Sequence, residues 1–422
     1  MRVIIKNLIT RVLVWEAKMA LRRHGPQIIG ITGSVGKSSA KEAVFAVLEQ
    51  KFNVRKGLKS YNSELGLSLA VLGLETRWLN PIGWLNNIYL GFKEIFKEFP
   101  KILILEMGVD RPGDLDKLLK IARPDIAIVT AVGEIPVHVE FFAGAEEVAK
   151  EKAKILKSLP ANGKAILNYD DETVWAMKEK TNAEVLGFGF ASGADVVASN
   201  YQISENGISF KIEHNGSTVP IRLKNVFGKQ AVYASLAAAA AGLVHSMNLI
   251  EISGALQKYQ PPPGRLRLIQ GIKNSFILDD SYNASPLAVH AALDTLKDFA
   301  GKRKMVVFGD MLEIGKFTIL AHKAVGERVA SFADYFVTVG PRAKFSAEEA
   351  VSRGMPKERV KSFSTTKEAA GYIKNIMQEG DLILVKGSQA MRMERIVEEI
   401  MATPEDAPKL LARQDKFWKD KE

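Results

Sequence analysis

Short runs of apolar residues alternate with longer amphipathic stretches along most of this chain. Between residue 27 and about residue 262, the apolar runs have the length and composition of buried strands, and the stretches between them have helical spacing. The runs that predict strands are 27–32, 102–106, 126–130 and 165–167. This alternation predicts an α/β fold with a mostly parallel sheet covered by helices.

Two interruptions divide the pattern. The apolar runs 208–212 and 219–223 flank Asn215-Gly216, a pair that predicts a β-hairpin. The stiff stretch Pro261-Pro-Pro-Gly264 predicts a linker, after which alternation restarts with strands at 276–278, 305–308, 335–339 and 382–385. We therefore expect three parts: an N-terminal helix (1–26), a central domain (27–262) and a Rossmann-like C-terminal α/β domain (263–422).

Two segments leave their environment open. Residues 1–24 predict a helix with apolar residues at positions 4, 8, 12, 15 and 19 along one stripe. Residues 76–100 hold two tryptophans, a tyrosine and three phenylalanines among few charges. Each segment either packs on the neighbouring domain or presents an apolar surface to a membrane or a partner protein. The charged end of the chain from Asp415 predicts a frayed terminus.

Composition narrows the class of protein. The 422 residues include no cysteine, which excludes disulfides and thiolate metal sites and fits a reducing cytoplasm. No window of about 18 uninterrupted apolar residues predicts a transmembrane helix. The net charge is +10, and residues 1–26 carry six basic and one acidic side chain, half of that excess. The remainder is too small to indicate a nucleic-acid protein and favours an anionic small substrate or a membrane surface.

The first predicted strand runs into a candidate phosphate-binding loop, Gly30-Ile-Thr-Gly-Ser-Val-Gly-Lys-Ser-Ser39. Glycines allow backbone N–H groups to approach phosphate oxygens, a lysine reaches the outer phosphates and a hydroxyl can ligate Mg²⁺. The spacing departs from the strict motif, because the first glycine should stand at position 31 and the chain has glycines at 30 and 33 instead. The candidate ATP-binding residues are Gly33, Ser34, Gly36, Lys37, Ser38 and Ser39.

Polar residues follow several other predicted strands. Glu106 ends the 102–106 strand and is a candidate Mg²⁺ ligand. His138 lies beyond the next strand, and Lys152 lies on a charged helix, where its default environment would be solvent. In the last domain, three segments at strand ends predict a ligand site facing the phosphate loop. They are 279–286, 309–315 and 386–388.

These ordered motifs resemble those of the Mur ligases, ATP-dependent amide-forming enzymes of peptidoglycan synthesis. The motifs are the loop Gly-Ser-Val-Gly-Lys-Ser, Tyr61-Asn-Ser-Glu-Leu-Gly66, Leu105-Glu-Met-Gly, His138-Val-Glu, Gly264-Arg265, Asp279-Asp-Ser-Tyr-Asn-Ala, Gly309-Asp-Met-Leu-Glu-Ile-Gly with His322, and Lys386-Gly-Ser. The Asp279 and Gly309 motifs are most similar to the branch that adds D-alanyl-D-alanine.

The resemblance implies a reaction and roles for residues. ATP would phosphorylate a carboxylate of an anionic muramyl peptide, and an amino acid or dipeptide amine would displace phosphate to form an amide. The implied roles are Lys37 on the phosphates, Ser38 and Glu106 on one Mg²⁺, His138 on a second, Lys152 as a carbamylated metal ligand, Arg265 near the γ-phosphate and Asp280 on the ribose. The implied substrate-binding residues are Asn62, Asn283, Lys386 and Ser388.

The sequence also departs from the family pattern. Only 26 residues precede the ATPase domain, where family members carry a UDP-sugar-binding domain; a membrane-held precursor or a partner protein could supply that recognition, at the inner face of the cell membrane. Ser63 replaces one of two paired asparagines. The base-contacting Gly-x-His-Asn motif is Gly228-Lys-Gln230-Ala231, so the base-binding asparagine is missing. The alternatives are a nucleotide-binding scaffold without ligase turnover, or ligation of another acid such as folate.

Overall fold

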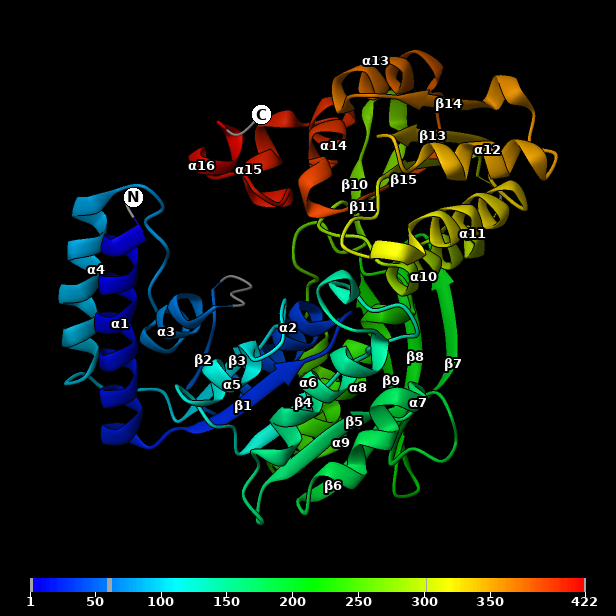
Figure 1. Cartoon of the computed structure of the whole chain (residues 1–422). Coiled ribbons are helices and arrows are strands. Elements are labelled where there is room, and N and C mark those ends of the chain that lie inside the picture. The colour runs from blue at the N-terminus through cyan, green and yellow to red at the C-terminus, as the bar shows by residue number, and fades with distance from the viewer. Residues whose placement is uncertain (1–2, 59–62, 301, 421–422) are drawn as a thin grey trace.

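Two β-sheets with helices on both faces make up the chain in the computed structural model, which describes residues 3–58, 63–300 and 302–420. Figure 1 shows the larger sheet in blue to green and the smaller sheet above it, in yellow to red with a green edge hairpin. The predicted α/β class, with a mostly parallel sheet and a second sheet after the proline stretch, is confirmed.

The larger sheet has the strand order β2-β3-β1-β4-β5-β6-β7-β8-β9, parallel from β2 to β7 and antiparallel from β7 to β9. Its strands are β1 Gln27–Thr32, β2 Val54–Lys56, β3 Ile102–Glu106, β4 Ile126–Val129, β5 Lys164–Asn168, β6 Glu184–Gly189, β7 Val196–Ser204, β8 Gly207–His214 and β9 Ser217–Lys224. The hairpin predicted at Asn215-Gly216 joins β8 to β9, and both turn residues have positive φ. β2, β6 and β7 escaped prediction.

The period of two along the strands divides the core into layers. On β1, Ile29 faces the layer of α2 (Lys37–Leu48), α8 (Lys229–Val244) and α9 (Leu249–Leu256), whereas Ile28 faces the opposite layer. That opposite layer contains α3 Glu64–Leu72, α5 Asp114–Leu119, α6 Ala145–Lys157 and α7 Glu172–Trp175. β1 lies between β3 and β4. The chain runs from β1 to β2 on the β3 side and later from β3 to β4 on the other side, and open α/β sheets bind ligands at the point where the strand order reverses in this way.

The smaller sheet has the order β10-β11-β15-β12-β13-β14, parallel except for β10 at its edge. Its strands are β10 Arg267–Gln270, β11 Phe276–Asp280, β12 Lys304–Gly309, β13 Tyr335–Val339, β14 Val360–Phe363 and β15 Leu382–Lys386. The helices are α10 Pro286–Asp298, α11 Thr318–Ala330 and α12 Lys344–Ser352 on one face, and α13 Thr366–Ile376 and α14 Glu394–Ile400 on the other. β15 lies between β11 and β12, so the ends of these three strands, with their polar motifs, are neighbours.

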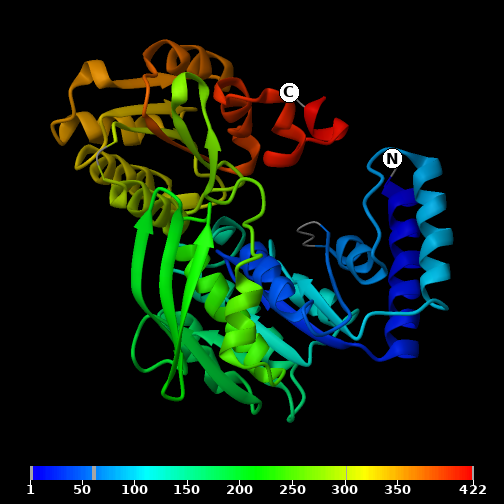
Figure 2. The ribbon, with the colours of Figure 1, turned by 180° about the vertical axis from the view of Figure 1, so that it is seen from behind.

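Helices α1 (Val3–His24) and α4 (Pro81–Glu94) lie side by side at the edge of the larger domain (Figures 1 and 2). The helix predicted for residues 1–24 is present, but it packs mainly through Leu13, Ala17 and Ala20, and Met19 of the predicted stripe is partly buried against the same core. Leu8 and Trp15 of that stripe are 62% and 52% exposed. The first segment therefore packs and also presents apolar side chains outward.

The C-terminal end of the chain folds back onto the N-terminal helices. After α15 (Ala407–Leu410), the short helix α16 (Lys416–Lys419) places Phe417 against Trp78, with stacked rings 4.1 Å apart between centroids. The expectation of a frayed end from Asp415 is wrong for residues 415–420, because aromatic packing stabilises them. None of the helices in the described part of the chain is long and apolar enough to cross a membrane.

Candidate active site

The loop between β1 and α2 has the conformation of an anion-binding turn. Gly33 and Gly36 have φ values of 143° and 89°, which side-chain-bearing residues rarely adopt. A Cβ at Gly33 would lie 2.1 Å from Oγ1 of Thr130. The N–H groups of Ser34 and Val35 donate to the carbonyl of Ala131 and are therefore engaged within the protein. The N–H groups that an anion would bind are those of the first turn of α2. The unusual glycine spacing thus matches a specific steric need.

Ser38 and Glu106 meet beside this loop. Parallel pairing sets Ile31 of β1 opposite Glu106 of β3, and the Ser38 Oγ lies 3.0 and 3.3 Å from the two carboxylate oxygens. Both side chains are buried. A hydroxyl and one carboxylate, completed by phosphate oxygens, form the donor set that Mg²⁺ prefers. Among the residues that the structure describes, no group of three or more His, Asp or Glu forms a metal cage, and this two-residue set needs none.

Lys37 and Lys152 share one acceptor. Their Nζ atoms lie 2.8 and 3.2 Å from the carbonyl oxygen of Gly33. Burial lowers the pKa of both ammonium groups, and burial together with the Lys37 charge lowers the pKa of Lys152 to about 7. Lys152 is 2% exposed, so the expectation that this side chain on a charged helix lies in solvent is wrong. The site thus holds an amine that is partly neutral at pH 7.

His138 joins the two domains. Its backbone has a φ of 68°, and its Nδ1 lies 2.8 Å from Oε2 of Glu313, in the C-terminal domain. Its Nε2 lies 3.3 Å from Oδ1 of Asp110, just after β3. The close approach of the His138 ring lowers the pKa of Glu313. Both ring nitrogens face carboxylates, so the ring acts here as a link between acidic groups from both domains.

A cavity of about 430 Å³ opens between the two domains. Nine of the predicted site residues line it: Gly33, Ser34, Lys37, Glu106, His138, Lys152, Arg265, Asn283 and Ser388. The guanidinium of Arg265 lies over the ring of Tyr282, 4.3 Å from its centroid. Three basic side chains and the acidic groups around His138 thus surround one space, an arrangement suited to phosphoryl transfer.

Asp280 and Lys386 form a buried ion pair away from this cavity. Lys386 also donates to the carbonyl of Asn283 at 2.9 Å, and Asp280 accepts from the N–H of Leu266 at 3.2 Å. Burial lowers the pKa of Lys386. Both residues line a narrow space of about 40 Å³, together with Gly36 and Ser39. Lys386 therefore does not reach the main cavity and holds the β11 and β15 ends together.

The remaining substrate-binding predictions have different outcomes. Ser388 lines the cavity, and its Oγ accepts a hydrogen bond from the N–H of Leu312 at 2.8 Å. The Asn283 Oδ1 accepts from the N–H of Ala284 at 2.9 Å. Asn62 lies outside the described residues.

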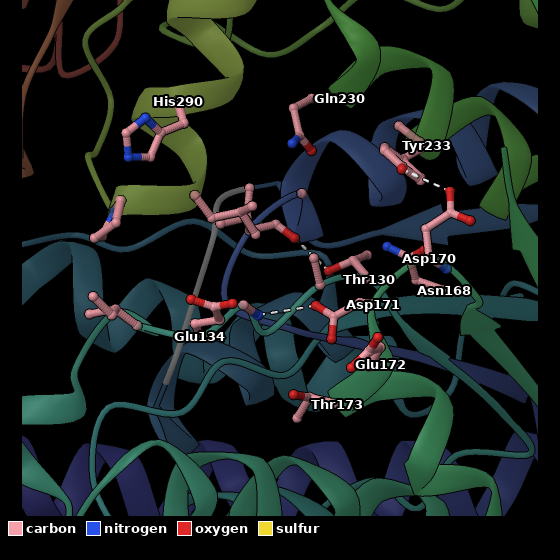
Figure 3. A pocket seen from close by; sticks show the side chains of 18 of the residues that line it. Thr130, Glu134, Asn168, Asp170, Asp171, Glu172, Thr173, Gln230, Tyr233 and His290 are labelled. Carbon is pink, nitrogen blue, oxygen red and sulfur yellow. Dashed lines mark hydrogen bonds between the residues drawn. The ribbon is translucent and has the colours of Figure 1, made fainter. Parts of the chain in front are cut away.

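A second cavity of about 580 Å³ lies on the other side of the loop, and Val35 lines both. Figure 3 shows Gln230 and Tyr233 of α8 and His290 of α10 around it, with Asp170 beside Tyr233 and with Asp171 below Gln230. The aspartates are engaged: Asp170 accepts from the Tyr233 hydroxyl at 2.8 Å, and Asp171 accepts from the N–H of Val132 at 2.8 Å. The side-chain amide of Gln230 makes no hydrogen bond to another described residue, so it is available to a ligand.

Sequence reasoning missed two residues of the main cavity, Asp110 and Trp418. Tyr282 and Glu313 also line it and lie in the predicted segments 279–286 and 309–315, although neither was given a role. Asp110 follows the end of β3 within five residues, a signal that could have found it. Trp418 lies in a charged terminal segment and reaches the cavity only through tertiary packing.

Comparison with known proteins places the chain among characterised sequences and folds. Residues 31–242 match the Mur ligase middle domain, and residues 264–389 match the Mur ligase, glutamate ligase domain. The UDP-N-acetylmuramoyl-tripeptide–D-alanyl-D-alanine ligase of Bacillus subtilis is 30% identical over 392 residues, which are 92% of this chain and 79% of that protein. The same ligase from Escherichia coli is 28% identical over 92% of this chain and 80% of its own. The crystal structure of the MurF ligase from Thermotoga maritima in complex with ADP superposes with a TM-score of 0.76 and 26% identity, covering 92% of this chain and 83% of that one.

Proposed function

This chain belongs to the Mur ligase family, and we propose that it joins D-alanyl-D-alanine, or a similar amine, to a muramyl peptide at the expense of ATP. The observation that carries the proposal is the convergence of Lys37, Lys152 and Arg265 with the Ser38–Glu106 pair at one interdomain cavity. The relatives named UDP-N-acetylmuramoyl-tripeptide–D-alanyl-D-alanine ligase support this choice of acceptor and amine, and the ADP-bound MurF structure supports the use of ATP.

The reaction has two steps in this proposal. A substrate carboxylate oxygen attacks the γ-phosphorus of ATP, the bond to the β–γ bridging oxygen breaks and ADP leaves. The amine then attacks the acyl carbon, a C–N bond forms, the C–O bond to phosphate breaks and phosphate leaves, while the amine loses its proton. Negative charge develops on the transferring oxygens, and the cationic side chains of Lys37 and Arg265 are placed to stabilise it.

Mg²⁺ is the expected cofactor with ATP, and Ser38 and Glu106 would hold it. The bound ion would neutralise charge on the β- and γ-phosphates. The Ser38 hydroxyl now donates to Glu106, so both groups already point at a common position. His138 with Asp110 is our proposed second cation site, in which the carboxylate supplies the oxygen that a hard cation prefers. Lys152 is the proposed carbamylation site, because its lowered pKa leaves a neutral amine available to carbon dioxide.

The nucleotide base would lie in the cavity beside Gln230. This cavity adjoins the phosphate loop through Val35, and its volume of about 580 Å³ is in the range of small-ligand sites. Asp280, near Gly36 and Ser39, remains our proposed ribose contact. Of the proposed substrate-binding residues, Asn283 and Ser388 would contact the acceptor or the amine, and Lys386 would act through Asn283.

A second candidate is a nucleotide-binding scaffold without ligase turnover. It is favoured by two departures from the family motifs: Gln230-Ala231 stands where the motif has His-Asn, and Ser63 replaces one of the paired asparagines. Against it, Lys37, Glu106, His138 and Lys152 are all present and line one cavity.

ADP release by the purified protein distinguishes the two. The ligase requires a muramyl tripeptide and D-alanyl-D-alanine together for ADP release, and mass spectrometry should find the amide product. The scaffold binds ATP but releases no ADP in response to any acceptor and amine, and that result would contradict the ligase.

The proposal includes a place of action and a domain division. We place the protein in the cytoplasm, at the inner face of the cell membrane, with peripheral contact through residues 1–24 and 76–100, or with a partner protein that supplies sugar recognition. The exposed apolar side chains of α1 and α4 support such contact. The division into 1–26, 27–262 and 263–422 fits the break between the two sheets.

A further inference from the structure

A groove of about 390 Å³ separates the N-terminal helices from the C-terminal helix α16. Its volume falls in the range of small-ligand sites, about 300–1,000 Å³. Aromatic and aliphatic side chains from α3, the segment before α4, α4 and α16 form most of its wall. They are Leu65, Leu69, Trp78, Leu79, Trp84 and Phe417.

The charge in this groove has one sign. Lys6 of α1 is its charged lining residue, and Ser63 and Thr76 add hydroxyls, so no acidic side chain of the described residues lines it. Lys6 is exposed and belongs to an unbalanced set: the other exposed charges of α1 are Arg11, Arg22 and Arg23. An apolar wall with a cation at its margin is complementary to an apolar chain that carries a phosphate.

The groove adjoins the proposed catalytic cavity at α16. Phe417 lines the groove, and the next residue, Trp418, lines the cavity. The ring of Phe417 stacks on Trp78 and the ring of Trp418 meets the edge of Trp78, with centroids 4.1 and 6.2 Å apart. A ligand in the groove would therefore lie one residue away from the space that holds the Lys37 and Lys152 ammonium groups.

The groove is also continuous with an exposed apolar face. Leu79 lines the groove and is 68% exposed, and α4 continues this exposure at a helical spacing. We define the α4 face as the exposed residues Leu79, Ile82, Leu85, Tyr89, Phe92 and Phe96. Such a face beside basic side chains is typical of a helix that lies in the interface of an anionic bilayer.

We infer that the acceptor carries an apolar chain through a phosphate, and that the chain lies in this groove while the α4 face rests on the bilayer that holds it. The inference rests on the proposed function for its acceptor peptide and names the class of carrier. The peptide of such an acceptor would have to pass only α16 to reach the cavity.

A binding experiment tests the groove without any catalysis. Geranylgeranyl diphosphate, added to the full chain, should bind saturably and change the fluorescence of Trp78 and Trp84. Leu79→Asp and Lys6→Glu should each weaken binding at least tenfold. The matched controls are Ile250→Asp on α9 and Lys150→Glu on α6. Both residues are exposed and lie outside the groove, so these variants should leave the binding unchanged. Absence of saturable binding, or equal weakening by the controls, overturns the inference.

An activity experiment tests the carrier. The same variants are compared on a muramyl tripeptide linked either to a polyprenyl diphosphate in phosphatidylglycerol vesicles or to UDP. The inference predicts a loss of kcat/KM of at least tenfold on the lipid-linked acceptor alone. An equal loss on both acceptors would make the groove merely structural and would overturn it. If neither acceptor reacts, the proposed function fails, and the binding experiment still decides the groove.

Discussion

The ammonium groups of Lys37 and Lys152 approach the same carbonyl oxygen, that of Gly33, to 2.8 and 3.2 Å. Two full positive charges that share one acceptor in a buried place are unfavourable, so loss of a proton from one of them is favoured. The pKa of Lys152 is accordingly lowered to about 7, with the Lys37 charge a named cause after burial.

Replacing Lys152 by Met should lower the rate of ADP release at least about 100-fold, since a group beside the transferring phosphate is lost. In the unchanged protein, the rate should rise between pH 6 and 8 and increase with added bicarbonate. The reason is that Lys152 is protonated below its pKa of about 7 and only its neutral amine, above that pH, reacts with carbon dioxide. Lys150→Met, on the exposed side of the same helix, is the control. A Lys152→Met protein of normal rate would refute this role.

Replacing Glu106 by Gln should remove the carboxylate of the proposed Mg²⁺ pair and lower kcat by about 10²–10³. The Mg²⁺ concentration for half-maximal ADP release should rise as well, because an amide oxygen carries no full charge. The measurement is ADP release against Mg²⁺ concentration. Glu146→Gln, in the first turn of α6, serves as a control and should change neither quantity. An unchanged Mg²⁺ dependence in Glu106→Gln would place the cation elsewhere.

Replacing Gln230 by Ala should weaken ADP binding about two- to tenfold, the worth of one net hydrogen bond. The amide of Gln230 lines the cavity proposed for the base and has no partner among the described residues. Isothermal titration measures the effect, with the exposed Gln257→Ala as control. Comparison with GDP adds a second readout, because the loss should be specific for adenine. Equal affinity in Gln230→Ala would move the base out of this cavity.

Replacing Glu16 by Gln should stabilise the protein above pH 7 and not at pH 4.5. Burial between α1 and α4 raises the pKa of Glu16 to about 7, and its Oε2 has no hydrogen-bond partner among the described residues. In the unfolded chain the carboxyl ionises near pH 4.5. The free energy of unfolding therefore falls as the pH rises from 4.5 to 7, and above pH 7 the folded chain carries the full cost of a buried carboxylate. That cost is at most about 3 kcal/mol, the equivalent of this pKa difference.

Thermal unfolding at pH 5 and pH 8 measures this effect. The Tm of Glu16→Gln should exceed that of the unchanged protein at pH 8, and the two should approach each other at pH 5. The exposed Glu98→Gln is the control, which should follow the unchanged protein at both pH values. A Glu16→Gln protein that is less stable at pH 8 would show that the ionised carboxylate has a stabilising partner.

Replacing Ile82 and Leu85 by Glu should abolish flotation of the protein with phosphatidylglycerol vesicles. These side chains are 78% and 68% exposed on the α4 face, and each apolar side chain buried in a bilayer contributes about 1.5–3 kcal/mol. Ile250→Glu is the matched control, because Ile250 is also 78% exposed, on α9. Binding should weaken with salt and be poor on zwitterionic vesicles. Failure of the unchanged chain to float would exclude the membrane contact.

Much of the fold was predictable from local pattern. The runs at 27–32, 102–106 and 335–339 coincide with β1, β3 and β13, because a fully buried parallel strand is a continuous apolar run bounded by turns. β2, β6, β7, β10 and β14 escaped, since they are short or partly exposed and lack that contrast. The face on which α1 packs also escaped, because a helix with apolar residues off its main stripe offers several faces and the neighbouring helix chooses one.

For the site, the sequence by itself determined the chemistry: a phosphate loop ending in Lys37 and Ser38, a carboxylate at the end of a neighbouring strand, and polar motifs at three later strand ends. These follow from local rules, because strand ends and helix starts fix where such groups stand. Only the tertiary structure decided that Lys152 is buried, that Glu313 reaches His138 across the domains, that Lys386 is held by Asp280, and that Phe417 and Trp418 close the chain onto Trp78. Each of these depends on contacts between residues far apart in the chain, whose distances and desolvation are set by packing and carry no local signal.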